Sequence, residues 1–124
     1  IGKRANEAVS SKVETSLRDY ETVTSYEVFK EAEKGDAVSK KILDEAFNYL
    51  GIGVANIIAS FDPDKVIIGG GVSKGGDVLF NKVQEVVNER CFKSMAEYCK
   101  IVPAGLGTDA GVLGAVALAI MESK

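Results

Sequence analysis

The sequence contains no histidine among its 124 residues, and it has only two cysteines and two prolines. Without histidine, the chain by itself lacks the commonest general base and the commonest metal ligand. The cysteines, Cys91 and Cys99, lie eight residues apart and form no C-x-x-C pattern. We therefore expect two buried or half-buried free thiols rather than a disulfide or a metal site, which fits a reducing cytoplasm.

The chain also lacks an excess of basic residues, because its 15 lysines and arginines are outnumbered by 18 acidic residues and the net charge is −3. No basic stripe is present, which argues against nucleic acid as the primary partner. The most apolar stretches, residues 50–61 and 110–121, are each about 12 residues long, whereas a bilayer span needs ~20. No secretory signal pattern is seen. We expect a soluble globular protein without a membrane partner.

Helical patterns fill the first half of the chain. Apolar residues at helical spacing predict an amphipathic helix over residues 1–19. Thr24 and Glu27 form a capping-box pattern that begins a short helix over 26–34, which Gly35 ends. Asp36 can cap a third helix that extends to Phe61. The charged run 31–34 is expected to be a solvated helix face.

The second half of that third helix is apolar on nearly every side, so we expect it to be buried on most sides. Gly51 and Gly53 are unfavourable in a helix interior, and close approach of a neighbouring element would compensate for them. Asn56 lies in this apolar stretch, and a buried amide needs hydrogen-bond partners. We expect a structural role for Asn56 rather than a catalytic one.

Two short strands are predicted in the second half, over residues 66–68 and 100–103. Asp77 is the expected cap of a helix over 78–90, and residues 91–98 extend that helix or form another turn. Asp109 is expected to cap a final helix over 110–121; its alternative role, a catalytic carboxylate, is the weaker interpretation. Two strands make a marginal sheet by themselves, and the chain begins with isoleucine. We therefore expect it to be part of a longer polypeptide.

The glycine triplet Gly69, Gly70 and Gly71 directly follows the first predicted strand. Glycine permits positive φ and removes side-chain bulk, and ligands of α/β proteins bind at the carboxyl ends of strands. The triplet is therefore either a contact with a small molecule or a tight strand-to-loop turn. It is not a G-x-G-x-x-G or Walker pattern, so the glycines alone leave both readings open.

Other glycines are weaker candidates for a ligand contact. Gly105 and Gly107 lie in a loop that could border a ligand, whereas Gly111 and Gly114 are expected where a helix approaches a sheet. Gly75 and Gly76, which precede Asp77, could bind an anion through free N–H groups at the start of a helix. The Asp77 carboxylate would repel an anion there, which favours capping of the helix by Asp77 itself.

The segment 49–73, YLGIGVANIIASFDPDKVIIGGGVS, strongly resembles the ROK family of sugar kinases and repressors. The run 107–119, GTDAGVLGAVALA, is similar to that family's C-terminal signature, and residues 1–5 are similar to the helix after its zinc and sugar motif. The resemblance covers nearly the whole chain. It implies part of the C-terminal domain of an actin-like, ribonuclease H-like sugar kinase, α/β in class and helix-rich with two short strands in this segment.

The resemblance implies ATP- and Mg²⁺-dependent phosphorylation of a hexose, glucose most commonly, by a cytoplasmic homo-oligomer. The cofactor-binding residues carried over are Gly69, Gly70, Gly71, Val72 and Ser73, in an adenosine-binding strand and loop over 65–73. Val72 would offer an apolar contact and Ser73 a hydroxyl. The helices over about 1–61 precede this unit, and the helix over 109–122 resembles the one beside the interdomain hinge.

The family's catalytic Asn-Asp pair, its DxGxT-like phosphate loop, its sugar-binding Glu-x-x-His and its cysteine-rich zinc motif do not occur in these 124 residues. We therefore expect no catalytic residue and no metal ligand in this segment, which would be inactive alone; any structural zinc would be bound upstream.

Two other functions stay open. A sugar-responsive ROK transcriptional repressor has a similar segment and would carry an N-terminal helix-turn-helix elsewhere. A standalone helical interaction domain would melt cooperatively as a monomer, whereas part of a kinase would expose apolar helix faces and associate.

Overall fold

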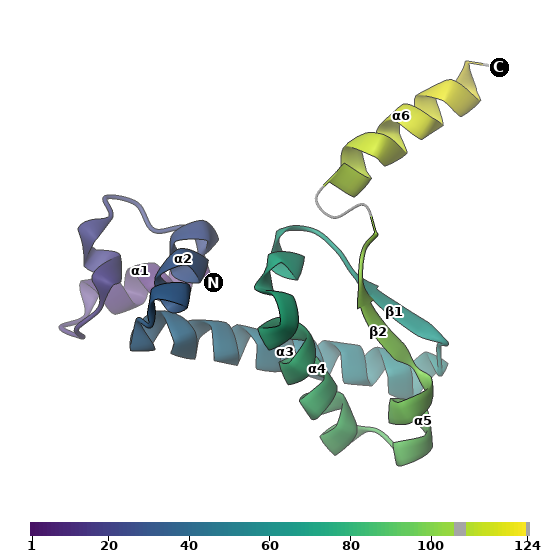
Figure 1. The fold of residues 1–124 in the computed structure, drawn as a ribbon, viewed down its shortest axis with the longest axis horizontal. Coiled ribbons are helices and arrows are strands. Elements are labelled where there is room, and N and C mark those ends of the chain that lie inside the picture. The colour runs from purple at the N-terminus through teal and green to yellow at the C-terminus, as the bar shows by residue number, and fades with distance from the viewer. Residues whose placement is uncertain (106–108, 124) are drawn as a thin grey trace. The chain divides into compact units, whose positions relative to one another are not determined.

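The computed structural model describes residues 1–105 and 109–123, and Figure 1 shows its elements as a ribbon. Internal contacts divide the chain into two units, Ile1–Gly51 and Ile52–Lys124. Helices dominate the described residues of both units, and the second unit also contains two short parallel strands. The expected helix-rich α/β segment with two short strands is confirmed.

The first unit contains helix α1 (Gly2–Ser10), the 3₁₀ helix η1 (Ser16–Asp19), helix α2 (Ser25–Lys34) and the first half of helix α3 (Ala37–Phe61). The prediction of one helix over 1–19 is wrong, because α1 ends at Ser10 and Ser11 is extended. The hydroxyl groups of Ser10 and Ser11 donate to the carbonyls of Asn6 and Ala8, at 2.9 and 2.7 Å. Serine side chains that bond to nearby backbone compete with helix continuation.

The predicted ends of α2 and the predicted start of α3 are confirmed. The Glu27 carboxylate accepts from the backbone N–H of Thr24 at 2.7 Å, and the Thr24 hydroxyl accepts from the N–H of Tyr26 at 3.3 Å. Gly35 ends α2 with φ +103°, and the Asp36 carboxylate accepts from the N–H of Ser39 at 2.8 Å. Local sequence therefore determines where α2 ends and α3 begins.

The core of the first unit consists of apolar side chains from all of its helices: Ala5, Leu17, Val23, Val28, Ala32, Ile42, Leu43 and Phe47. The Phe29 and Phe47 rings lie 6.1 Å apart, centre to centre. Glu31 is also buried, with 4% of its surface exposed. The expected solvated face over 31–34 is therefore wrong at Glu31, which polar groups from η1 and the preceding loop surround.

The second unit contains strands β1 (Lys65–Ile68) and β2 (Lys100–Pro103), the 3₁₀ helix η2 (Gly71–Gly75), and helices α4 (Gly76–Arg90), α5 (Lys93–Tyr98) and α6 (Ala110–Glu122). The strands are parallel, with Lys65 opposite Lys100 and Ile68 opposite Pro103. Both predicted strands are confirmed. The buried apolar side chains here are Val54, Ala55, Ile58, Ile68, Leu79, Val83, Val86, Val87, Ala96 and Cys99.

The predicted cap of α4 is wrong. The helix begins at Gly76, Gly75 occupies the capping position, and no side chain caps it. Gly76 has φ +57°, because η2 ends there and the chain turns directly into α4. Asp77 therefore lies inside the first turn, past the position from which a carboxylate caps a helix.

The second half of α3 is buried on one face only, which contradicts the expected burial on most sides. Val54, Ala55 and Ile58 are buried, but Ile57 is 46% and Phe61 78% exposed. Asn56 is exposed rather than buried, and a Cβ on Gly53 would meet open space. The elements of this unit pack against one side of the helix, so its remaining apolar residues have no cover there.

By length and composition, α3 could cross a bilayer, with a mean hydropathy of 1.2 over its most apolar 18 residues. Core helices of soluble proteins meet the same criterion, and 39% of that stretch is buried in the fold. The absence of a membrane partner stays a prediction.

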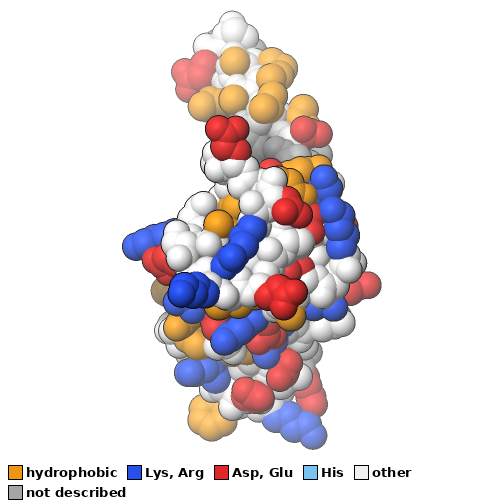
Figure 2. Space-filling model, turned by 90° about the vertical axis from the view of Figure 1, so that its left-hand side faces the viewer, with side chains coloured by type: hydrophobic (Ala, Val, Ile, Leu, Met, Phe, Trp, Pro, Cys, Tyr) orange, Lys and Arg blue, Asp and Glu red, His pale blue; other side chains and the backbone are white. Residues whose placement is uncertain are grey.

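Helix α6 is exposed at every residue from 111 to 122. Apolar side chains in solvent include Val112, Leu113, Val116, Leu118, Ile120 and Met121. Figure 2 shows apolar side chains gathered on this helix, whereas charges of both signs interleave on the face toward the viewer. Asp109 occupies the capping position as predicted, but its side chain makes no capping hydrogen bond.

Candidate functional site

The carboxyl ends of β1 and β2 lie at the same edge of the sheet, because the two strands are parallel. Gly69 follows β1 and Ala104 follows β2, and the N–H of Ala104 donates to the carbonyl of Ile68 at 2.9 Å. A Cβ on Gly69 would lie 3.4 Å from the Cβ of Ala104. The predicted glycine triplet therefore stands at the edge where α/β sheets bind ligands, next to the end of the second strand.

Within the triplet, only Gly70 requires the freedom of glycine. Its φ is +77° and its ψ is −170°, a conformation that residues with a Cβ rarely adopt. The Ser73 N–H and hydroxyl both donate to the Gly70 carbonyl, at 3.2 and 2.7 Å. These bonds close a tight turn that leads into η2. The interpretation of the triplet as a tight strand-to-loop turn is therefore correct at Gly70.

The same edge also presents uncovered backbone. Gly69, Gly70 and Gly71 are all exposed, and a Cβ on Gly71 would meet open space although its backbone needs no positive φ. Val72 and Ser73 are half-buried. A flat, largely neutral group could lie against this backbone, because no described side chain within the triplet covers it.

The other glycines that the sequence singled out contribute less. Gly105 is exposed beside this edge, and Gly107 lies outside the described residues. A Cβ on Gly111 or Gly114 would meet open space, so the expected approach of helix and sheet at these glycines is wrong within the described part of the chain.

The thiols are free, as predicted: Cys91 is half-buried and Cys99 is buried. The Cys91 thiol donates to the carbonyl of Ala55 at 3.4 Å, and burial raises the pKa of the Cys99 thiol. A raised pKa keeps a thiol protonated and poorly nucleophilic. In residues 1–105 and 109–123, no group of three His, Cys, Asp or Glu side chains could hold a metal ion.

A polar cluster in the first unit, formed by Ser16, Tyr20, Glu31 and Lys34, was not predicted. The Glu31 carboxylate accepts from the Lys34 ammonium at 2.7 Å, the Ser16 hydroxyl at 2.5 Å and the Tyr20 hydroxyl at 2.7 Å. The Lys34 ammonium and the two hydroxyls lower the pKa of Glu31 from 4.5 to about 2. Every oxygen of this carboxylate has partners, so we interpret the cluster as structural.

Asp36 also binds Ser16, which belongs to this cluster, and the neighbouring Thr15. Its carboxylate accepts from the N–H of Ser16 at 3.1 Å and from the hydroxyls of Thr15 and Ser39 at 3.0 and 2.6 Å. Burial raises the pKa of Asp36, but the hydrogen bonds from Ser39, Ser16 and Thr15 outweigh burial and lower it. The only sequence signal for this arrangement is the pair Thr15–Ser16, which caps no predicted helix.

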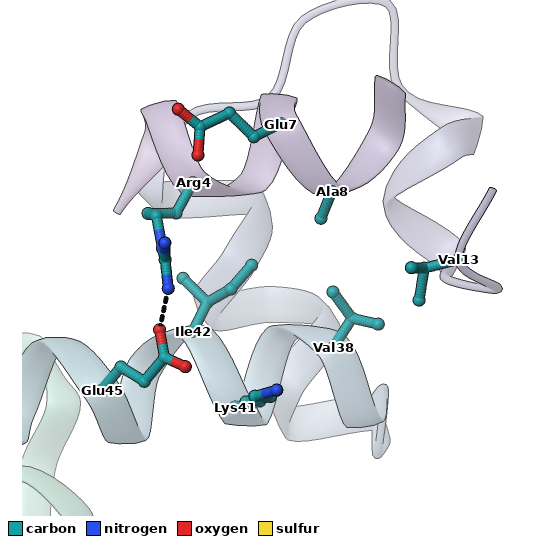
Figure 3. Close-up of a pocket in the computed structure, with 8 residues that line it drawn as sticks. All are labelled: Arg4, Glu7, Ala8, Val13, Val38, Lys41, Ile42 and Glu45. Atoms are coloured by element: carbon teal, nitrogen blue, oxygen red, sulfur yellow. Dashed lines mark hydrogen bonds and ion pairs between the residues drawn. The ribbon is translucent and has the colours of Figure 1, made fainter. Parts of the chain in front are cut away.

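A groove of about 250 Å³ lies between α1 and α3 in the first unit (Figure 3). Its lining residues are Arg4, Glu7, Ala8, Val13, Val38, Lys41, Ile42 and Glu45. The Arg4 guanidinium bonds to the Glu45 carboxylate, and this bond raises the pKa of Arg4. Since two acidic and two basic side chains surround an apolar floor, the groove has no net charge to select an ionic ligand.

Comparisons with known proteins agree on one family. The ROK family profile matches residues 3–122. A glucokinase of Halalkalibacterium halodurans is 35% identical over 118 residues, which are 92% of this chain and 36% of the relative. A xylose repressor of Caldicellulosiruptor bescii is 33% identical over 107 residues, 86% of this chain and 27% of the relative. The chain therefore spans about a third of these relatives or less.

Among solved structures, a ROK family glucokinase from Streptomyces griseus, crystallised with glucose and AMPPNP, has a similar fold. The TM-score is 0.76 at 23% identity, over 94% of this chain and 40% of the other. This likeness shows that the two units have the fold of the corresponding part of a ROK sugar kinase.

Proposed function

The chain belongs to the ROK family, and we propose that the intact protein transfers a phosphoryl group from ATP to a hexose, with glucose as the proposed substrate. Its glucokinase relatives support this proposal, as does a structural neighbour that was crystallised with glucose and AMPPNP. We propose that this segment binds the adenosine end of the nucleotide at the loop formed by Gly69, Gly70, Gly71, Val72 and Ser73.

One observation carries the assignment of the site. The triplet lies at the carboxyl edge of two parallel strands, and its backbone is exposed there with no side chain of its own to cover it. A purine is flat and has a π face, so it needs a close and unobstructed surface more than it needs charge. Val72 can add an apolar contact beside it.

The chemical step is assigned to residues outside this chain. Phosphoryl transfer requires a base for the sugar hydroxyl and groups that stabilise the charge on the transferring phosphoryl group, Mg²⁺ among them. The described residues contain no group of three His, Cys, Asp or Glu side chains that could hold a metal ion. That this segment supplies no ligand to Mg²⁺ or Zn²⁺ stays a prediction. We further propose a cytoplasmic homo-oligomer, and the free thiols are compatible with that compartment.

A nucleotide titration of the intact protein tests the site. Gly70→Val would be ambiguous, because Gly70 has φ +77° and a valine there would strain the turn. Gly71→Val avoids this problem, since a Cβ on Gly71 meets open space in the unliganded fold. We expect its Kd for AMPPNP to rise about tenfold or more, as steric exclusion of a closely packed base requires.

The matched control is Gly53→Ala on α3, where a Cβ also meets open space. It should leave nucleotide affinity unchanged. Unchanged AMPPNP affinity in Gly71→Val, with an unchanged melting temperature, would refute the adenosine role.

A second test concerns the proposal that this segment is not catalytic by itself. The purified 124-residue chain should show no ATP-dependent phosphorylation of glucose, because it lacks the family's base and phosphate loop. Measurable glucose 6-phosphate formation, detected by a coupled dehydrogenase assay, would refute this expectation.

The xylose repressors among the relatives favour a second candidate, a sugar-responsive transcriptional repressor. This segment is similar in both classes, so the rest of the protein distinguishes them. A helix-turn-helix before the first domain together with sequence-specific DNA binding would identify a repressor, whereas ATP-dependent sugar phosphorylation by the intact protein would identify a kinase.

A further inference from the structure

Ser73 directs two donors at one acceptor. Its hydroxyl donates to the carbonyl oxygen of Gly70 at 2.7 Å, and its backbone N–H donates to the same oxygen at 3.2 Å. Donor and acceptor are three positions apart in the sequence, so the bonds close a single turn at the end of β1. The hydroxyl hydrogen of Ser73 is therefore engaged within the chain.

These bonds fix the orientation of one peptide plane. The Gly70 carbonyl and the Gly71 N–H belong to the same planar trans peptide, in which they point to opposite sides. Holding the carbonyl toward Ser73 therefore turns the Gly71 N–H away from Ser73. Gly70 has φ +77° and ψ −170°, and glycine at such angles has many alternatives when nothing restrains it.

We propose that Ser73 is a positioning residue for the nucleotide, which acts through Gly70 and does not itself contact the nucleoside. This inference rests on the proposed adenosine site. The Ser73 hydroxyl holds the peptide between Gly70 and Gly71 in the orientation that forms the flat surface of the site. Without the hydroxyl bond, only the longer bond from the Ser73 N–H restrains this peptide, so it samples other orientations more often and nucleotide binding has to select one of them.

The bond contributes little to the overall fold. Gly69, Gly70 and Gly71 are exposed, so water can replace the hydroxyl at the Gly70 carbonyl when Ser73 is changed. The second bond to this carbonyl, from the backbone N–H of Ser73, does not depend on the side chain. A loss of nucleotide affinity without a loss of stability would therefore be the signature of this role.

The test uses the intact protein with Ser73→Ala and Ser73→Thr, measured by calorimetric titration with AMPPNP and by steady-state kinetics. For Ser73→Ala, we expect the Kd for AMPPNP and the KM for ATP to rise about three- to tenfold, the range of one neutral hydrogen bond. The kcat, the KM for the sugar and the melting temperature should stay near wild-type values. Ser73→Thr keeps the hydroxyl and should restore affinity. Ser94→Ala, at an exposed serine of α5, is the matched control and should change nothing.

A double-mutant cycle with Gly70→Ala separates positioning from direct contact. A Cβ at φ +77° displaces the Gly70 peptide, so adding Ser73→Ala to that variant should cause little further loss. Additive losses would overturn the positioning role and favour a direct contact of Ser73 with the nucleotide.

The remaining outcomes distinguish this inference from the proposed function. Normal affinity in Ser73→Ala, together with weak binding in Gly71→Val, would overturn the role of Ser73 and leave the adenosine site standing. Normal AMPPNP affinity in both variants would overturn the adenosine site and the positioning role with it.

Discussion

Residues Ile1–Gly51 use polar side chains to hold their segments together, whereas Ile52–Lys124 leave large apolar side chains in solvent. In the first unit, two carboxylates, Glu31 and Asp36, accept seven hydrogen bonds from neighbouring side chains and backbone N–H groups. In the second, Ile67 is 62% and Phe61 78% exposed, and α6 is exposed throughout its described side chains.

The first unit satisfies its polar groups internally, whereas the second exposes apolar side chains that another chain or domain could cover. Carboxylates whose oxygens have hydrogen-bond donors need no further partner, whereas exposed apolar surface of this extent is typical of surfaces that another chain or domain covers. The candidate nucleotide site also lies in the second unit. The candidate site and the exposed apolar side chains are therefore on the same part of the chain.

The largest expected effect on stability comes from the core of the first unit. Phe47→Ala removes a ring that is 1% exposed and contacts Phe29, and we expect a loss of about 3–5 kcal/mol in the free energy of unfolding. Tyr49→Ala on the same helix, where the side chain is 74% exposed, should change it by less than about 0.5 kcal/mol. Urea unfolding measures both. Equal losses in the two variants would show that this core is not formed as described.

A smaller loss is expected when the carboxylate cluster is broken. Glu31→Gln removes the charge that pairs with Lys34, and it forces a donor toward the Ser16 and Tyr20 hydroxyls. The melting temperature at pH 7 should fall by several degrees. Glu33→Gln, at an exposed site on the same helix, is the control and should leave it unchanged.

The same carboxylate predicts a pH dependence. The pKa of Glu31 is lowered from 4.5 to about 2 in the folded chain, so its ionised form favours folding above pH 4.5. This contribution should disappear as the pH falls from 4.5 toward 2, because protonation of the folded state then becomes necessary. The melting temperature of Glu31→Gln should therefore fall less steeply over this range than that of the wild type. Parallel slopes would contradict the role assigned to Glu31.

Replacing glycine by alanine should change the free energy of unfolding in opposite directions at one position in each unit. Gly35 ends α2 with φ +103°, so Gly35→Ala should cost about 1–2 kcal/mol in the free energy of unfolding. Gly53 has open space beside it within a helix, so Gly53→Ala should be neutral or stabilising by up to about 1 kcal/mol. Chemical denaturation measures both, and a stabilising Gly35→Ala would refute the need for glycine there.

The smallest effect on folding is expected at α6. Val116 is 50% exposed, and Val116→Lys should change the free energy of unfolding by less than about 0.5 kcal/mol. It should nevertheless reduce self-association of the 124-residue chain in sedimentation velocity, because it places a charge on an apolar surface. Ser94→Lys on α5 adds the same charge at a polar site and should not reduce it. A wild-type chain that is monomeric and melts cooperatively would instead favour a standalone domain.

Much of the fold was predictable from short stretches of sequence. Thr24 with Glu27, Gly35, and Asp36 with Ser39 mark helix ends through bonds that span three or four residues, so a reader of the sequence can recognise them. The two strands were found in the same way, from short apolar runs bounded by proline and glycine. The break between α1 and η1 was missed, because the helical spacing of the apolar residues continues through Ser10 and Ser11, whose hydroxyls bond to the backbone where α1 ends. Asp36 then holds Thr15 and Ser16 from about twenty residues away, which local sequence does not reveal.

The candidate site was only partly predictable. The triplet and its place after a strand were visible in the sequence, but three consecutive glycines do not reveal which of them needs positive φ. Only the folded loop shows that Gly70 does and that the Ser73 hydroxyl is bonded to its carbonyl. The expected cap at Asp77 is wrong for a similar reason, because η2 leads directly into α4 and places Asp77 inside the first turn. Asp109 occupies the capping position, but its side chain makes no capping hydrogen bond.

By itself, the sequence determined most of the helices, the caps of α2 and α3, the two strands and the ROK signature, because these depend on neighbouring residues and on motifs of fixed spacing. Tertiary structure alone decided that Glu31 is buried, that Asn56 and much of the apolar surface of α3 are exposed, and that Gly69 lies beside Ala104. These features depend on which distant segments pack together. Burial and proximity are properties of that packing, and no local pattern of residues specifies them.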